Sequence, residues 1–204
     1  MDKIKVAVLV SGGGTNLGAL IEAEKNGIIK SGTLSLVISN KVGAYALERA
    51  KSAGIESLTV TKAECGSQEA FEDRLIAELK SRGIELIVLA GFMAILSEKF
   101  TKTFEDRIIN VHPSLIPSFC GKGFYGLRVH EAALEYGVKV TGATVHFVNE
   151  IPDGGRIILQ KSVNIKKGDT PEILQRRVME QAEWRILPRA CELVSRELIK
   201  GKNV

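Results

Sequence analysis

The sequence has no long apolar segment. Hydrophobic residues make up 45% of its 204 positions, but no apolar run approaches the roughly 20 residues that a membrane-spanning helix needs. The N-terminal run MDKIKVAVLV ends in glycines and lacks the small-residue cleavage site of a secretion signal. We therefore interpret it as the first strand of a cytoplasmic protein that does not associate with membranes.

Cysteine is also scarce. Cys65, Cys120 and Cys191 are an odd number and show no CxxC spacing, which argues against both a disulfide framework and a zinc site. We expect no bound metal and expect the cysteines to act as small apolar residues, with Cys120 of interest because it falls in a loop. The net charge is +4, but the lysines are spread along the chain, so charge does not indicate a nucleic-acid partner.

Repeats, low-complexity tracts and interdomain linkers are absent as well, so a single domain is expected over residues 1–204. Short apolar runs alternate with helical patterns through its first half. Strands are predicted at 4–10, 33–39, 56–60, 85–91 and 108–112, and helices at 16–27, 44–54 and 67–83. This alternation predicts an α/β fold with a doubly wound, mostly parallel, Rossmann-like sheet, whose ligands bind at the carboxyl ends of the strands.

The pattern changes after residue 120. The runs 141–148 and 156–165 flank NEIPDGG, as two strands joined by a turn would, so an antiparallel strand pair is expected near the C-terminus. A long amphipathic helix is predicted from Thr170 onward, with an Asp/Thr cap and a proline in its first turn. Pro188 is expected to break or kink this helix.

The first predicted strand runs into SGGGTN, residues 11–16, and then into a helix. This arrangement aims backbone N–H groups at an anion, and it indicates either a monophosphate site or a plain tight turn. No Lys-Ser/Thr follows the glycines, which excludes a nucleoside-triphosphate P-loop. Leu17 stands where a dinucleotide fingerprint needs its third glycine, and no acidic residue ends the second strand, which argues against a nicotinamide-dependent dehydrogenase.

One of only three histidines lies where a predicted strand ends, in INVHP. Residues two apart on a strand point the same way, so Asn110 and His112 are expected to face one centre. Pro113 restricts the backbone of His112 and helps to hold its ring. Asn supplies a donor to a developing oxyanion and His transfers protons near neutral pH, so this pair is a candidate catalytic site.

Asp153, in the predicted turn, is a third candidate, and close to His112 its carboxylate is expected to raise the imidazole pKa. The alternative for all three residues is structural, since an isolated His at a strand end and an Asp in a turn usually have structural roles. His130 and His146 lie within predicted secondary structure and are interpreted as structural.

Five segments taken together resemble one family: SGGGTNLGALIEA, VISNKVGAYALERAKSAGI, LAGFMAILSEKF, INVHPSLIPSF and VTGATVHFVNEIPDGGRIILQ. They are similar to successive signatures of the phosphoribosylglycinamide formyltransferases, over nearly the whole chain. The resemblance implies transfer of the formyl group of 10-formyltetrahydrofolate to the amine of 5-phosphoribosylglycinamide, in purine synthesis and without a metal. It also implies that Asn110 holds the formyl oxygen, that His112 transfers protons, and that Asp153 tunes His112 and accepts protons.

The same resemblance implies where the substrates bind. Residues 1–105 would form a phosphate-binding half, and residues 106–204 a catalytic and folate-binding half. The glycinamide substrate would contact Gly14, Thr15, Asn16 and Glu183. The folate would contact Gln68, Met93, Ala94, Ile95, Leu96, Asn110, Asn149, Glu150, Ile151 and Pro152. The expected partners are these small molecules, with the protein a monomer or a weak homodimer.

Four features depart from the family pattern. Ala94 and Gln68 stand where many relatives have arginine, so other cations are expected to contact the acidic tail of the folate. The stretch 118–131, SFCGKGFYGLRVHE, is longer than the compact loop common in the family, and Arg156 replaces a proline.

Rival functions remain open at this point. A formyltetrahydrofolate deformylase, in which water accepts the formyl group, would be expected to carry an added N-terminal domain. A methionyl-tRNA formyltransferase would carry a C-terminal one. Chain length is expected to disfavour both. A phosphate-binding module without catalysis is the alternative from a different class.

Overall fold

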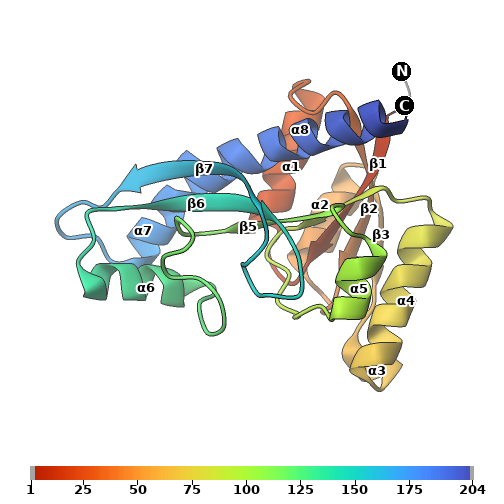
Figure 1. The fold of residues 1–204 in the computed structure, drawn as a ribbon, viewed down its shortest axis with the longest axis horizontal. Coiled ribbons are helices and arrows are strands. Elements are labelled where there is room, and N and C mark those ends of the chain that lie inside the picture. The colour runs from red at the N-terminus through yellow and green to blue at the C-terminus, as the bar shows by residue number, and fades with distance from the viewer. Residues whose placement is uncertain (1–2, 203–204) are drawn as a thin grey trace.

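A computed structural model of the chain describes residues 3–202 and shows one seven-stranded sheet flanked by helices (Figure 1). The spatial order of the strands is β3-β2-β1-β4-β5-β6-β7. Their bounds are β1 Ile4–Val10, β2 Gly32–Ser39, β3 Glu56–Thr59, β4 Leu86–Leu89, β5 Ile108–His112, β6 Val140–Phe147 and β7 Ile157–Asn164. All seven were predicted from the sequence.

The sheet is parallel from β3 to β5 and antiparallel from β5 to β7. Five parallel strands with a Rossmann-like order and an antiparallel pair at one end confirm the predicted fold class. β5 lies at the seam, because it pairs parallel with β4 on one side and antiparallel with β6 on the other.

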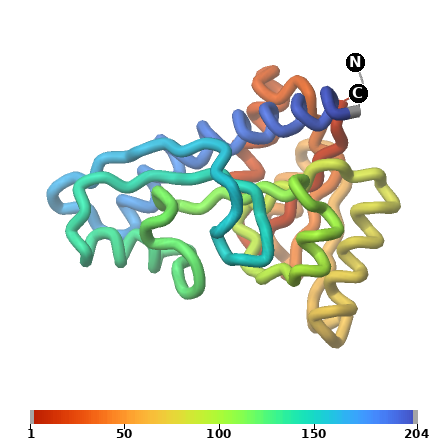
Figure 2. Tube along the Cα trace, viewed as in Figure 1, coloured from red at the N-terminus to blue at the C-terminus, as the bar shows by residue number. Residues whose placement is uncertain are grey.

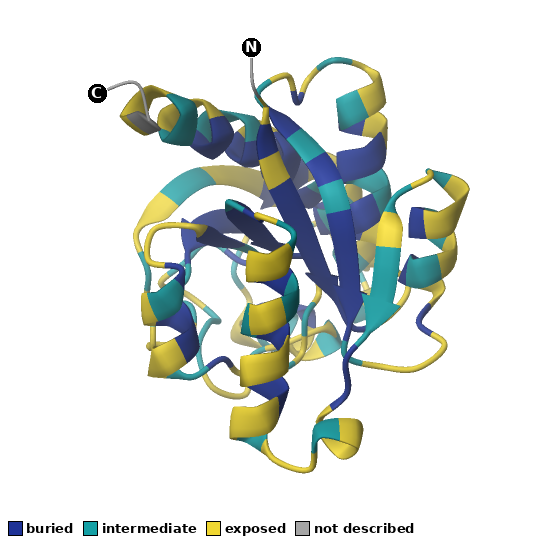
Figure 3. Cartoon of the chain, turned by 90° about the vertical axis from the view of Figure 1, so that its right-hand side faces the viewer, coloured by how far each residue is buried: buried dark blue, intermediate teal, exposed yellow. Residues whose placement is uncertain are grey.

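Helices cover both faces of the sheet, and Figure 3 shows that the strands between them are mostly buried. Alternate residues of β1 point to opposite faces: Val6 and Val8 pack beneath α1 and α8, whereas Ala7 and Leu9 pack beneath α4. Burial on both faces explains why these strands are continuous apolar runs. The helices are α1 Thr15–Lys25, α2 Tyr45–Ser52, α3 Lys62–Cys65, α4 Gln68–Ser81, α5 Glu98–Thr103, α6 Leu127–Tyr136, α7 Pro171–Val178 and α8 Trp184–Lys202.

Three of these helices were not predicted. α3 and α5 are a single turn or little more, and each begins at a Thr or Ser whose side chain accepts from the backbone three residues on. α6 falls within and beyond the stretch 118–131, whose glycines and aromatic residues obscured its helical pattern.

The final helical region is continuous but irregular. A π-helical segment, Met179–Glu183, joins α7 to α8, and α8 continues through Pro188. Of the predicted break or kink at Pro188, the break is therefore wrong. The wide turn that adjusts the hydrogen-bonding pattern lies just before the proline, and such π segments are frequent at functional sites.

Two connections project from the same side of the sheet, below it in Figure 2: the green loop before α6 and the blue-green turn between β6 and β7. They bring residues that follow β5 and β6 toward one another. Within residues 3–202, no helix is long and apolar enough to cross a membrane.

Candidate active site

Asn110 and His112 occupy the end of β5, at the seam of the sheet. In the antiparallel register, Asn110 lies opposite His146 and His112 opposite Thr144. His112 is 5% exposed, and Asn110 is half-buried. The predicted juxtaposition of the carboxamide and the imidazole on one strand is therefore present in the fold.

The loop after His112 is fixed by hydrogen bonds to the antiparallel strands. The hydroxyl of Thr144 donates to the carbonyl of Ser114 at 2.7 Å and accepts from the Ile116 N–H at 3.1 Å. Gln160 on β7 donates to the Ile116 carbonyl at 3.0 Å. A loop held at several points keeps the ring of His112 in a defined place.

The DGG turn carries Asp153 back to β5. Asp153 adopts a left-handed φ of 56°, a conformation that Asp tolerates better than most residues. A Cβ atom on Gly155 would lie 1.8 Å from the Phe147 carbonyl oxygen, so only glycine allows this close approach. The second glycine of the motif is thus required for the turn that delivers the carboxylate.

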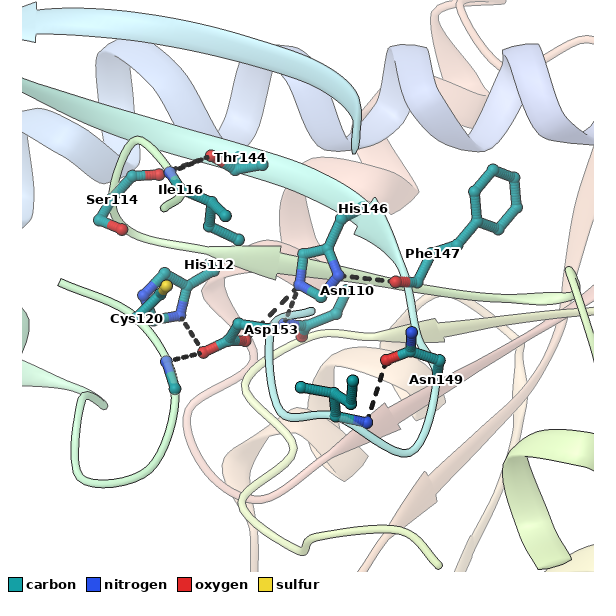
Figure 4. Close-up of polar contacts among 12 residues, drawn as sticks. Asn110, His112, Ser114, Ile116, Cys120, Thr144, His146, Phe147, Asn149 and Asp153 are labelled. Atoms are coloured by element: carbon teal, nitrogen blue, oxygen red, sulfur yellow. Dashed lines mark hydrogen bonds and ion pairs between the residues drawn. The ribbon is translucent and has the colours of Figure 1, made fainter. Parts of the chain in front are cut away.

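Figure 4 shows Asp153 between the rings of His112 and His146. Its Oδ2 lies 3.4 Å from Nδ1 of His112 and accepts from the Gly121 N–H at 2.8 Å. Nε2 of His112 lies 2.9 Å from the Phe119 carbonyl oxygen. A carbonyl only accepts, so Nε2 carries a proton, and a proton on Nδ1 completes a charged pair with Asp153.

His146 belongs to the same cluster, which the sequence did not indicate. Its Nδ1 lies 2.7 Å from the carbonyl oxygen of Phe147, and its Nε2 lies 3.2 Å from Nδ2 of Asn110. Asp153 Oδ1 lies 3.6 Å from the same Nε2. His146 therefore orients the amide of Asn110, and interpreting it as an ordinary strand residue was incomplete.

The pKa of His112 is set by its burial as well as by the neighbouring Asp153. Burial lowers the pKa of His112 and outweighs Asp153 and the Phe119 carbonyl, which raise it. The expected effect of Asp153 is present, but the net pKa of His112 is below its ordinary value. Burial raises the pKa of Asp153, yet the His146 ring, the charge of His112 and the Gly121 N–H together bring it below its ordinary value.

Replacing Asp153 by Asn is expected to lower the pKa of His112 further, because it removes the charge that favours the imidazolium. We also expect catalysis to slow more than substrate binding weakens. NMR titration of the His112 ring in both proteins measures the pKa change. An unchanged pKa would contradict the electrostatic role of Asp153.

The glycine loop before α1 is held from α2. The Gly12 carbonyl accepts from the Ala46 N–H at 3.1 Å, and the Gly13 carbonyl accepts from Nε of Arg49 at 2.8 Å. Gly14 has a φ of 67° and caps α1 without a side chain. The first N–H groups of a helix have no intrahelical partner, so this end of α1 can bind an anion.

Asn16 and Glu183 meet beside this loop, although they are far apart in the chain. Nδ2 of Asn16 donates to Oε2 of Glu183 at 2.7 Å, and Oδ1 of Asn16 is buried without a partner among the described residues. Burial raises the pKa of Glu183 to about 7, although the bond from Asn16 lowers it. Thr15 is exposed, and its hydroxyl points to the sulfur of Met179 at 3.9 Å.

A cavity of about 610 Å³ lies beside the loop 91–97, between β4 and α5. Met93, Ala94, Ile95 and Leu96 form part of its wall, as does Gln68. Lys62 is the one cation among its lining residues. Nε2 of Gln68 donates to Glu72 at 2.8 Å and to the Ile95 carbonyl at 3.2 Å, so this amide nitrogen supports the wall itself.

Residues 149–152 form the rest of the turn that ends at Asp153. Oδ1 of Asn149 accepts from the Ile151 N–H at 3.0 Å, and Glu150, Ile151 and Pro152 are exposed. The guanidinium of Arg156 lies over the Phe147 ring at 4.5 Å, in the place where the family has a proline.

Cys120 adjoins this polar cluster, beside His112 in Figure 4, and burial together with the charge of Asp153 raises the pKa of its thiol. His130, Cys65 and Cys191 make none of the contacts described above. His130 is 1% exposed and neither of its ring nitrogens has a partner in the described part of the chain. Burial lowers the pKa of His130 to about 4, so it is uncharged at neutral pH. All three cysteines are free, and no group of His, Cys, Asp and Glu within residues 3–202 is arranged to hold a metal.

An imidazole, a carboxamide and a carboxylate thus meet at one strand end of an α/β sheet, a combination of groups that can support group transfer coupled to proton transfer. The sequence model of the formyl transferase family matches residues 4–191, and the chain belongs to this family.

Similar proteins carry more specific names. Phosphoribosylglycinamide formyltransferase of Escherichia coli K12 is 42% identical over 178 residues, which cover 87% of this chain and 81% of that protein. The crystal structure of glycinamide ribonucleotide transformylase 1 from Symbiobacterium toebii is 42% identical, with a TM-score of 0.89 over 96% of this chain and 89% of that one. The trifunctional purine biosynthetic protein adenosine-3 of Gallus gallus is 47% identical over 95% of this chain, which spans 19% of that protein's length.

Proposed function

We propose that the protein transfers the formyl group of 10-formyltetrahydrofolate to the amine of 5-phosphoribosylglycinamide, in purine synthesis. The observation that carries this proposal is the position of Asn110, His112 and Asp153. Asn110 and His112 lie at the end of β5, and the turn between β6 and β7 brings Asp153 to within 3.4 Å of His112. The glycine loop of the same fold can bind a phosphate, and its 91–97 loop borders a cavity. The names of the relatives from Escherichia coli and Symbiobacterium toebii support the same reaction.

The chemistry follows from the three side chains. Attack of the substrate amine on the formyl carbon places negative charge on the formyl oxygen, and Nδ2 of Asn110 has a second N–H to donate to it. When protonated, His112 stabilises the same charge and gives its proton to the departing folate nitrogen. Asp153 favours this protonated form, against the burial that lowers the resting pKa of His112, and accepts the proton lost by the amine.

The glycinamide substrate would lie along the edge formed by α1 and the π segment. Gly14, Thr15 and Asn16 offer the N-terminal N–H groups of α1 to its phosphate. Glu183 would accept hydrogen bonds from the ribose hydroxyls, and its hydrogen bond from Asn16, beside the glycine loop, supports this role.

The folate would occupy the cavity beside the 91–97 loop. Met93, Ala94, Ile95 and Leu96 supply its wall, and Asn110 with the turn of Asn149, Glu150, Ile151 and Pro152 would border the reactive end. The side-chain nitrogen of Gln68 is engaged within the wall, so we assign Lys62, which also lines the cavity, to the acidic tail of the folate.

Further proposals concern the organisation of the protein. Residues 1–105 supply the glycine loop and the 91–97 wall, and residues 106–204 supply the proton-transferring residues, so the phosphate and catalytic roles divide between the halves of one domain. We propose a cytoplasmic protein that acts as a monomer or weak homodimer on small molecules and binds no nucleic acid.

The test is the rate of folate deformylation, followed by absorbance, with and without 5-phosphoribosylglycinamide. We expect a rate that depends on the glycinamide and yields its formyl derivative. Equal rates without the glycinamide would identify water as the acceptor and replace this proposal with a hydrolase. No turnover in either case would leave a phosphate-binding module.

A further inference from the structure

The 91–97 loop is held from two sides although it has no regular secondary structure between β4 and α5. At one end the N–H of Met93 donates to Oγ of Ser11 at 2.8 Å. At the other end the N–H of Ser97 donates to Oε1 of Glu72 at 2.8 Å, and the Ser97 hydroxyl donates to Oε2. Two buried side chains, Ser11 (6% exposed) and Glu72 (2% exposed), therefore anchor the two ends of the loop.

Ser11 lies at the base of a second loop. It directly follows β1 and precedes Gly12, Gly13 and Gly14, whose loop opens α1. β1 and β4 are neighbours in the sheet, so the segments that leave their carboxyl ends emerge side by side. The Ser11 hydroxyl bridges these segments across 82 positions of the chain.

Glu72 attaches the other end of the 91–97 loop to a different part of the fold. It lies on α4, and its other partner is Nε2 of Gln68, at 2.8 Å, which also donates to the Ile95 carbonyl. These bonds attach the loop to α4. The glycine loop takes its own support from Ala46 and Arg49 on α2, so Glu72 and the glycine loop share no hydrogen bond among the described residues.

We infer that Ser11 is a positioning residue that fixes the separation of the two substrates. This inference rests on the proposed function, in which the glycine loop holds the amine-bearing substrate and the 91–97 loop holds the formyl donor. Reaction between two bound molecules depends steeply on their distance, and a misplacement of about 1 Å can lower the rate about 100-fold. A single hydrogen bond between the two loops therefore affects turnover more than it affects either affinity.

The experiment compares Ser11→Ala with Glu72→Gln. Ser11→Ala is expected to lower kcat at least about tenfold while both KM values stay within about threefold, because each loop keeps its other supports. Ser11→Thr keeps the hydroxyl and is expected to recover most of kcat. Glu72→Gln weakens only the far anchor of the wall and is expected to raise the KM for the folate and not that for the glycinamide.

A second measurement is independent of turnover. Hydrogen exchange of the Met93 amide, followed by NMR, is expected to be slow in the native protein, fast in Ser11→Ala and slow in Glu72→Gln. A native kcat in Ser11→Ala, or an unprotected Met93 amide in the native protein, would overturn the inference. If the native protein transfers no formyl group to the glycinamide, the proposed function fails, whereas Met93 exchange still decides whether Ser11 joins the two loops.

Discussion

Replacing His112 by Gln is expected to lower kcat for formyl transfer by about 10²–10⁴-fold, with KM values within about threefold of the native protein. The glutamine amide can still donate to the Phe119 carbonyl, as Nε2 of His112 does at 2.9 Å, so the loop is expected to keep its place. It cannot transfer a proton near neutral pH, and this difference removes the catalytic contribution of the ring.

The matched control is His130→Gln. This histidine is as deeply buried, but burial lowers its pKa to about 4, so removing it leaves the charge around His112 unchanged at pH 7. We expect kcat of His130→Gln to stay within about threefold of the native value. Comparable losses of kcat in both variants, in steady-state assays at pH 7, would show that a buried imidazole is needed for the fold and not for the reaction.

The second large effect is an expected change in the stability of the fold when Glu183 is replaced by Gln. Glu183 is fully buried and has a pKa of about 7 in the folded protein, against an ordinary value of 4.5 in the unfolded chain. As pH rises from 4.5 to 7 the unfolded chain releases a proton that the folded protein retains, so the stability of the fold decreases across this window. Above it the ionised carboxylate costs roughly 3 kcal/mol.

The uncharged glutamine removes this cost. Thermal denaturation is expected to show Glu183→Gln more stable than the native protein at pH 8, by roughly 5–10 °C in Tm, and nearly equal to it at pH 4.5. The same variant is expected to bind the glycinamide substrate more weakly, since the proposed ribose contact loses its charge. Equal Tm differences at both pH values would show that Glu183 does not titrate as described.

For Glu192→Gln, also in the C-terminal helical region, we expect the opposite change in stability. The pKa of Glu192 lies below its ordinary value, because the backbone N–H groups of Ser31 and Lys30 and the Ser31 hydroxyl outweigh the effect of burial. Its stabilising effect is present above the unfolded pKa and is lost as pH falls through the folded pKa. Glu192→Gln is therefore expected to lower Tm at pH 8, where Glu183→Gln raises it.

The sequence predicted the sheet better than the site. Parallel strands buried on both faces, such as β1 and β4, are continuous apolar runs, and this signal needs no knowledge of the fold. His146 was interpreted as structural because its contact with Asn110 depends on the register between β5 and β6, which no local pattern specifies. The Phe119 carbonyl that orients His112 belongs to the backbone and has no side-chain signature.

The effect of Asp153 on the pKa of His112 was predicted correctly, but the larger effect of burial was not predicted, for a related reason. A nearby carboxylate can be inferred from a motif, but the depth of burial that outweighs it depends on the packed fold. The break predicted at Pro188 failed similarly, because the wide turn at Met179–Glu183 is a property of the folded helix and has no composition of its own.

The bond between Asn16 and Glu183 joins residues 167 positions apart. During synthesis the glycine loop leaves the ribosome 167 residues before its carboxyl partner. Contacts of such long range form late, since the intervening chain must first lose its conformational freedom. A nascent chain that has completed the parallel strands therefore still lacks the bond between Asn16 and Glu183, at the proposed substrate site, until the region from α7 to α8 docks.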